Sequence, residues 1–311
     1  MSQIIPSKPT FEFNNQVSPR YIEPLFLRLE YGTWYSQADL RLLLRSGGLD
    51  LKGDNIVQNN TAVWTLAGLG RSRSVEFAGR MPSRLFQLSE LGREVSATYS
   101  TNRELFFDLM HFFFYSTWIR SRQIMRARFW LYANACDALW TEAPGATDSF
   151  QLTNRLQIEC RSVFPGHNPS FSERSVRSVF PWLGSLTPPF LARCGNKSQL
   201  CSERRSYCTP QLFHLAVDLM YTAQGLRYGT SMAIDDDRIT AICRTCLLDI
   251  SRFWYMTELA QMAVRGFDIQ RGQWGTSIIL DGRPKWIDLP DFTVDHPDLS
   301  DDDVEEEEDR A

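Results

Sequence analysis

The fold is decided by residues 36–95, which begin with SQADLRLLLRSGG (36–48) and continue with NIVQNNTAVWTLAGLG (55–70). Ser36 is a favourable N-cap residue, and the helix formers that follow it run as far as Gly47. Because Ser caps helix starts and Gly ends helices, these signals predict a first helix between them.

A second helix, a hairpin and a third helix are predicted next. Asp54 caps residues 55–69, whose apolar residues recur at helical spacing. Two short strand patterns, 75–77 and 85–88, then flank a turn rich in Gly and Pro, and Ser89 starts another helix. This order is that of a winged helix, a helix-turn-helix variant whose second helix can enter the major groove of DNA.

Length and composition bound the rest of the prediction. The chain has 311 residues, of which 43% are apolar and 13% aromatic, enough for two or three small domains with a sizeable core. No apolar run is long enough to span a bilayer, and the N-terminus lacks the charged start and apolar core of a signal peptide. We therefore expect a cytoplasmic protein that does not enter a membrane.

Charge is distributed unevenly along the chain. Residues 298–311 hold nine acidic residues and one arginine, a net charge of −8, which leaves +4 on the rest of a chain whose total is −4. Arginine, whose fork fits phosphate and guanine, makes up 29 of the 33 basic residues, although genomic base composition explains that excess equally well. The acidic tail is predicted to be disordered, either as a solubilising terminus or as a DNA mimic that competes for a basic groove.

The predicted fold class is mainly α, in four parts. Residues 1–98 form an N-terminal winged-helix domain, and residues 99–233 a helical middle with a cysteine-containing loop. Residues 234–290 repeat the order helix, helix, hairpin, and form a C-terminal winged-helix-like unit without a residue-by-residue repeat of the first. Residues 291–311 form the acidic disordered tail.

Polar residues of the second helix and arginines of the hairpin form the candidate DNA-binding surface. Asn and Gln pair with adenine edges, while Arg reaches phosphates or the minor groove. Two further arginines, four residues apart in a stretch (103–140) that reads as one helix or two, share a helix face. The alternatives are a solvated helix face and a protein-packing module. The candidate residues are Asn55, Gln58, Asn59, Asn60, Thr61, Arg71, Arg73, Arg80, Arg84, Arg122 and Arg126.

The cysteines form the candidate metal site. Cys194, Cys201 and Cys208 are spaced by seven in a loop, and Cys243 and Cys246 form a C-x-x-C in a helical pattern. In a cytosolic chain such clustering favours a metal over a disulfide, so the three loop thiols with Cys246 or Cys243 would complete a zinc site or, second, hold an iron–sulfur cluster. The alternative is that these are small buried residues and incidental loop thiols.

Catalytic motifs are absent from the sequence. The four histidines have no neighbouring Ser or Cys in a nucleophile motif, and no P-loop, G-x-G-x-x-G or H-E-x-x-H occurs. The sequence therefore favours a non-catalytic DNA-binding or adaptor subunit with protein partners. A protein-interaction scaffold without DNA contact is one alternative, and a metal-dependent or iron–sulfur enzyme of nucleic-acid processing is the other.

Several short segments resemble a known family. They are Phe11 with Arg20-Tyr21, Asn55-Ile56-Val57 followed by Trp64 and Gly68-Leu69, Leu88-Ser89-Glu90-Leu91-Gly92, and Leu109-Met110-His111. Together they resemble an uncharacterised winged-helix family encoded with phosphorothioate-type DNA modification and anti-phage defence genes. That family's Gly-His start and its glycine-rich turn before the Asn-containing helix are missing here. The resemblance implies a helical protein with winged-helix units in a defence or DNA-modification complex, and it transfers no catalytic residue.

Overall fold

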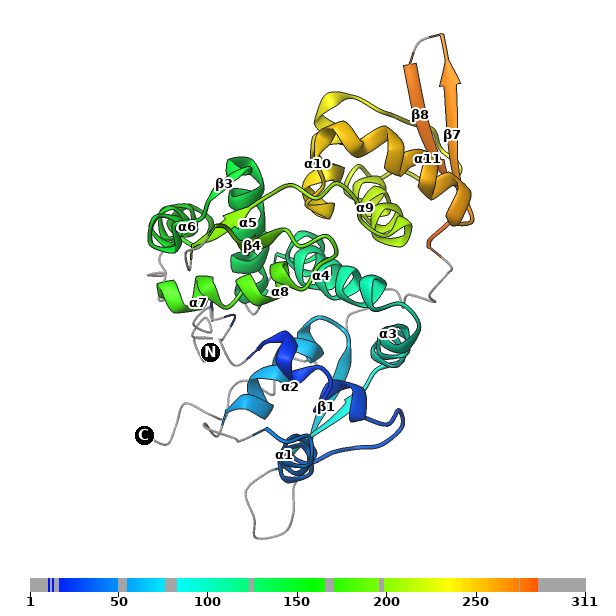
Figure 1. Ribbon diagram of the computed structural model, residues 1–311. Coiled ribbons are helices and arrows are strands. Elements are labelled where there is room, and N and C mark those ends of the chain that lie inside the picture. The colour runs from blue at the N-terminus through cyan, green and yellow to red at the C-terminus, as the bar shows by residue number, and fades with distance from the viewer. Residues whose placement is uncertain are drawn as a thin grey trace, which may run out of the picture.

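The computed structural model describes residues 11, 13, 17–49, 55–75, 83–122, 126–165, 171–195, 199–273 and 275–284. Over these residues the protein is mainly helical, with eleven α-helices and three small sheets (Figure 1). The α-helices are α1 (Gln37–Ser46), α2 (Ile56–Leu66), α3 (Glu90–Thr101), α4 (Arg103–Arg120), α5 (Ala127–Glu142), α6 (Ser149–Val163), α7 (Glu173–Arg177), α8 (Phe180–Gly184), α9 (Pro210–Ala223), α10 (Asp236–Cys246) and α11 (Phe253–Ala263). Short 3-10 helices are η1 (Pro19–Tyr21), η2 (Phe26–Arg28) and η4 (Ile250–Arg252). The strands are β1 (Gly70–Val75), β2 (Ser83–Leu88), β3 (Gly145–Ala146), β4 (Leu191–Arg193), β5 (Leu200–Ser202), β6 (Met232–Ala233), β7 (Phe267–Gly272) and β8 (Gly275–Leu280).

The first part, η1 through α3, is called the N-terminal unit below. Its α1 begins at the predicted cap: the Ser36 hydroxyl accepts from the Asp39 amide at 3.2 Å, and the Asp39 carboxylate accepts from the Ser36 amide at 2.8 Å. Strands β1 and β2 pair as an antiparallel hairpin, and Tyr35 adds an isolated bridge to Phe86 on β2. The first strand comes earlier than predicted, because Gly70 lies against Phe86 and pairing already begins there. Asp54, residues 76–82 and the acidic tail lie outside the described residues.

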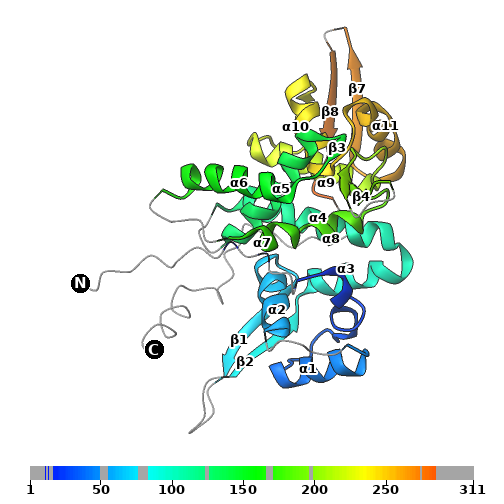
Figure 2. The same cartoon turned by 60° about the vertical axis from the view of Figure 1, so that its left-hand side comes forward.

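The middle of the chain is built on α4 and α5. The predicted stretch 103–140 is two helices, because α4 ends at Arg120 and α5 begins at Ala127. Thirteen of the eighteen residues of α4 are buried, as expected for a helix that is apolar nearly all round. Helix α4 packs against α3 on one side and α9 on the other, with α5, α8 and α10 also in contact (Figure 2). The small sheet β3-β5-β4 and helices α6–α8 complete this part.

The last part, α9 through β8, is called the C-terminal unit below. It contains the expected helix, helix, hairpin order in α10, α11 and β7–β8. Its sheet has the order β6-β8-β7, so that the short strand β6 pairs with the second strand of the hairpin, Met232 opposite Ile278. The Asp235 carboxylate caps α10 by accepting from the Arg238 amide at 2.9 Å.

A buried ion pair lies where the middle of the chain meets the C-terminal unit. Arg205 Nη2 lies 2.8 Å from Asp108 Oδ1 on α4, and both side chains are fully buried. The other Asp108 oxygen accepts from the Thr209 amide at 2.8 Å, at the start of α9. Arg205 also donates to the carbonyl oxygens of Thr187, Pro188 and Cys246. The ion pair offsets the two buried charges, and the hydrogen bonds hold α4, the start of α9 and the end of α10 together.

Apolar residues from all three parts form one buried cluster, with α4 running through it. None of the helices in the described ranges combines the length and the apolar character that crossing a bilayer requires.

Candidate nucleic-acid interface and the cysteine pair

Three of the five predicted polar residues lie at the surface near the start of α2. Asn55 is exposed at the N-cap of the helix, and it makes no side-chain capping hydrogen bond. Gln58 is exposed and Asn59 is half-buried. Residues three and four apart on a helix share a face, so these three amides form one polar patch.

The other two residues of that set turn inwards or bond to their own helix. Asn60 is 1% exposed, and its Nδ2 donates to the Ile56 carbonyl at 2.8 Å. Thr61 is half-buried, and its hydroxyl donates to the Val57 carbonyl at 2.9 Å. The prediction is corrected for Asn60, because the face that packs on the core includes this position, and Thr61 has used its only donor.

The hairpin arginines are divided between two faces. Arg71 pairs with Gln87 and Arg73 with Leu85, so both lie on the outer face of the hairpin, and both are exposed. The Arg73 guanidinium lies 4.2 Å from the centre of the Trp34 ring, a cation–π contact that fixes its direction. Arg84 pairs with Ser74 and is exposed on the opposite face.

The structure therefore brings Arg71 and Arg73 together and places Arg84 apart from them. Arg80 lies outside the described residues.

The expected shared face of Arg122 and Arg126 is wrong. Arg122 follows the end of α4 and is exposed, whereas Arg126 is the half-buried N-cap of α5. Helix α4 ends before Arg122, so the four-residue spacing does not place the two side chains on one helix face.

The C-terminal unit offers a different surface at the corresponding helix. In α11, Trp254, Tyr255 and Met262 are 40%, 54% and 79% exposed. The helix carries no Arg or Lys, and its charged residue, Glu258, is paired with Arg271 of β7 at 2.5 Å. The second helix of each unit thus differs in its exposed surface: it is polar near the start of α2 in the N-terminal unit and largely apolar on α11 in the C-terminal unit.

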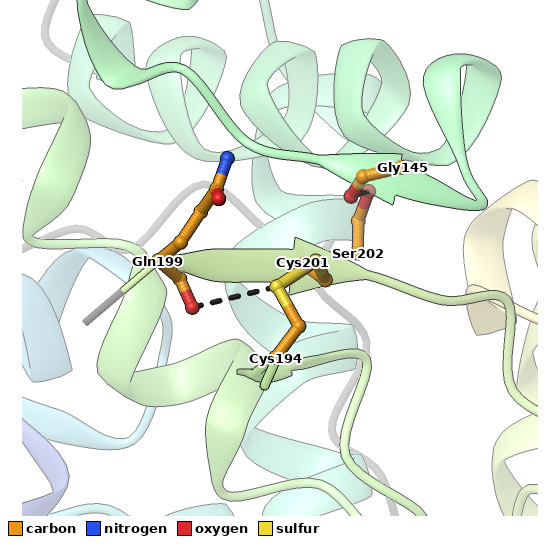
Figure 3. Close-up of a disulfide and its surroundings, with 5 residues drawn as sticks. All are labelled: Gly145, Cys194, Gln199, Cys201 and Ser202. Carbon is orange, nitrogen blue, oxygen red and sulfur yellow. Dashed lines mark hydrogen bonds between the residues drawn. A yellow bond between two sulfur atoms is a disulfide. The ribbon is translucent and has the colours of Figure 1, made fainter. Parts of the chain in front are cut away.

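Two of the predicted metal-binding cysteines are bonded to each other. Cys194 and Cys201 form a disulfide with a Cα–Cα distance of 5.7 Å, and it closes the β4–β5 hairpin (Figure 3). The Cys194 amide also donates to the Gln199 carbonyl at 3.1 Å, and β5 continues to Ser202, which pairs with Gly145 of β3. A seven-residue spacing across a Gly-containing turn fits a hairpin, and this is the signal from which the pairing could have been found.

The remaining predicted ligands are buried together in another place. Cys208, Cys243 and Cys246 are fully buried free thiols. Burial, with Cys208 close by, raises the pKa of the Cys246 thiol well above its usual value. Within the ranges that the structure describes, no group of three or more His, Cys, Asp or Glu is arranged to hold a metal ion. The four thiols Cys194, Cys201, Cys208 and Cys246 are therefore not brought together as predicted.

His111, the histidine of α4, is held as a neutral structural residue. Its Nε2 lies 2.9 Å from the Thr245 carbonyl, which can only accept, so Nε2 carries the proton and Nδ1 accepts from the Tyr132 hydroxyl at 3.0 Å. Burial lowers the pKa of His111 to about 4. With both nitrogens engaged and no access to solvent, this histidine is not placed to act as a catalytic base.

Comparisons with known proteins give a likeness of fold. No protein-family model matches the sequence, and no curated protein matches it. Among solved structures, a crystal structure of SspB is similar to this chain at 13% sequence identity, with a TM-score of 0.51 over 88% of this chain and 81% of that chain. The likeness covers most of both chains and concerns the fold alone.

Proposed function

We propose that this protein is a non-catalytic DNA-binding adaptor subunit of a DNA-modification or anti-phage defence complex. The observation that carries the proposal is the contrast between its two units. One presents a polar helix beside an arginine-bearing hairpin, and the other presents an apolar helix without a cation. One surface fits DNA, and the other fits a protein.

Each unit is proposed to be a winged helix. In both units a short strand segment precedes two helices and a hairpin, and it pairs with the second hairpin strand: Tyr35 with Phe86, and Met232 with Ile278. In such a unit the second of the two helices is the one presented to a groove. That helix is α2 in the N-terminal unit and α11 in the C-terminal unit.

The N-terminal unit is proposed to make the DNA contact. Asn55, Gln58 and Asn59 would face base edges, which Asn and Gln read by paired hydrogen bonds. Arg71 and Arg73 would reach the backbone beside that groove, where contacts position the protein without reading sequence. The polar amides of α2 lie in the same unit as the exposed arginines of its hairpin, and this combination favours DNA binding over the alternative that the amides are only solvated.

The C-terminal unit is proposed to hold a protein partner. Helix α11 offers no cation to a phosphate, but it exposes Trp254, Tyr255 and Met262 on a surface helix. Aromatic residues and Met are enriched in the cores of protein interfaces, and exposed apolar patches mark such sites. The sequence resemblance to a family encoded with DNA-modification and defence genes supports a place in a multi-subunit complex.

The DNA contact is tested by a salt series. The double variant Arg71→Ala/Arg73→Ala should bind a DNA duplex more weakly, with the slope of log K against log salt reduced by roughly two, since each lost phosphate contact removes about 0.9. The control, Arg227→Ala/Arg265→Ala, removes two exposed arginines of the C-terminal unit and should leave the slope unchanged. Fluorescence anisotropy measures both. An unchanged slope in the first variant, with the fold intact, contradicts the proposal.

The partner contact is tested separately. Trp254→Ala/Met262→Ala should lose a partner that co-purifies in fixed stoichiometry, and it should keep full DNA affinity. The control, Phe150→Ala/Ile158→Ala, changes an equally exposed apolar pair on α6 and should keep the partner. If the α11 variant still co-purifies with the partner, the proposal that α11 binds the partner is contradicted.

A further inference from the structure

A pocket of about 340 Å³ lies between the residue that leads into η1 and the helices α7 and α8 of the middle of the chain. It is lined by Ser18, Glu173, Arg174, Arg177, Ser178 and Pro181, and is called the α7 pocket below. Ser18 directly precedes η1, whereas the other lining residues lie on α7, at the start of α8 or between them. A hydrogen bond of 3.2 Å from Trp182 Nε1 to the Val17 carbonyl holds the two walls together.

The pocket contains two guanidinium groups whose positive charge is not neutralised by a strong ion pair with a neighbouring carboxylate. Arg174 is exposed and forms no ion pair within the described part of the chain. Arg177 lies 3.9 Å from Glu173, with both side chains exposed, so this pair is weak. The Glu173 carboxylate is already engaged, because it accepts from the Ser149 hydroxyl at 2.5 Å. The pocket therefore has capacity for an anion.

The hydroxyl groups define what that anion must offer. Ser178 donates to the Ser175 carbonyl at 2.5 Å, so its proton is taken. Ser18 makes no side-chain capping hydrogen bond, and its hydroxyl remains able to donate into the pocket. Two planar arginine forks and one hydroxyl donor require several acceptor oxygens on one centre, which is the chemistry of a phosphoryl group.

We propose that the α7 pocket binds a phosphate of the DNA backbone, so that the DNA contact extends from α2 across the junction to the middle of the chain. This inference rests on the proposed function. Figures 1 and 2 both place α7 on the side of the middle of the chain that faces the N-terminal unit. A duplex held by α2 and its hairpin continues beyond them, and its backbone needs cations at such a position. A free phosphomonoester has the same chemistry and is the other source to be distinguished.

The first test is a salt series on the full chain. Arg174→Ala/Arg177→Ala should weaken binding of a DNA duplex and lower the salt slope by roughly two, in addition to the loss from Arg71→Ala/Arg73→Ala. Arg227→Ala/Arg265→Ala is the matched control. An unchanged melting temperature shows that each variant is folded. If only the hairpin variant lowers the slope, the proposed function stands and the α7 pocket is not part of the DNA contact.

The second test uses inorganic phosphate alone, followed by broadening of its phosphorus NMR line. The parent protein should broaden the line, and Arg174→Ala/Arg177→Ala should not. If Arg174→Ala/Arg177→Ala abolishes the broadening but leaves the salt slope of DNA binding unchanged, the DNA assignment is overturned in favour of a free phosphomonoester. Broadening by a parent protein that does not bind DNA overturns the proposed function and leaves the pocket as a phosphate site. No broadening and no slope change overturn the inference entirely.

Discussion

Breaking the buried pair between Asp108 and Arg205 should destabilise the protein far more than breaking an exposed pair of the same length. Arg205 Nη2 and Asp108 Oδ1 are 2.8 Å apart with no exposed side-chain surface. Asp108→Asn keeps an acceptor for the Thr209 amide but leaves a buried guanidinium without its counter-charge. Since removing one partner of a buried pair costs about 3–5 kcal/mol, we expect about 3 kcal/mol for this change.

Removal of Arg205 should cost more. Arg205→Met abandons three carbonyl oxygens as well as the Asp108 carboxylate, so we expect about 5 kcal/mol. The double variant should lose much less than the sum of the two, because neither charge is then left buried alone. The control is Arg155→Ala, which breaks two exposed ion pairs. One joins Glu142 and is also 2.8 Å long, with side chains 43% and 55% exposed, and the other joins Glu159 at 2.9 Å. That change should cost at most about 1 kcal/mol.

Urea unfolding followed by far-UV circular dichroism measures all four free energies of unfolding. The reasoning is refuted if the two buried single variants each lose less than about 1 kcal/mol, which is the upper range for an exposed pair. It is also refuted if the two losses are additive, because the argument requires that each charge becomes costly only when its partner is gone.

Three further outcomes are expected. Without reductant, alkylation of the unfolded chain should leave Cys194 and Cys201 unmodified, and labelling of all seven cysteines in that mass spectrum would exclude the disulfide. Burial lowers the folded-state pKa of His214 to about 4, below its unfolded value near 6.5, so its contribution to stability is lost as pH falls from 6.5 towards 4. Because neither ring nitrogen of His214 has a hydrogen-bond partner among the described residues, His214→Leu should flatten this acid loss at little cost at pH 7. At pH 7, His111→Leu should lower the free energy of unfolding by about 1–3 kcal/mol, because it removes two hydrogen bonds. If His111→Leu and His214→Leu lower it equally at pH 7, the argument is contradicted. Deletion of residues 298–311 should raise non-specific DNA affinity at low salt, with a gain that shrinks as salt rises; lower affinity after deletion would reject the competition model.

The parts of the fold that local chemistry determines were predictable from the sequence. Ser36 and Ser89 were predicted to start helices, and each accepts a hydrogen bond from a backbone amide at the start of α1 or α3. The order of two helices and a hairpin was likewise predictable in both units. These features depend on neighbours within a few residues, so a single sequence carries the necessary information.

The parts that depend on tertiary packing were not predictable. Asn60 and Asn59 are adjacent polar residues of one type, and only the direction of the core decides that Asn60 is buried. The disulfide depends on the register of β4 and β5, which a count of cysteines does not contain. The α7 pocket joins Ser18 to Arg174 and Arg177, which are more than 150 positions away along the chain. No local pattern relates these positions.

Helix α4 has consequences for how the chain can be divided and how its two ends communicate. Thirteen of the eighteen residues of α4 are buried, so a fragment boundary within this helix would expose apolar side chains to water. Phe106 packs against Phe26 and Tyr99 of the N-terminal unit, while Asp108 and His111 on the same helix engage Thr209 and Thr245 of the C-terminal unit. A fragment that stops before α4 would leave Phe26 and Tyr99 without their covering ring. Less than two turns of α4 therefore contact both units, so a separation of the chain on either side of this helix would leave one of the units without its packing partner.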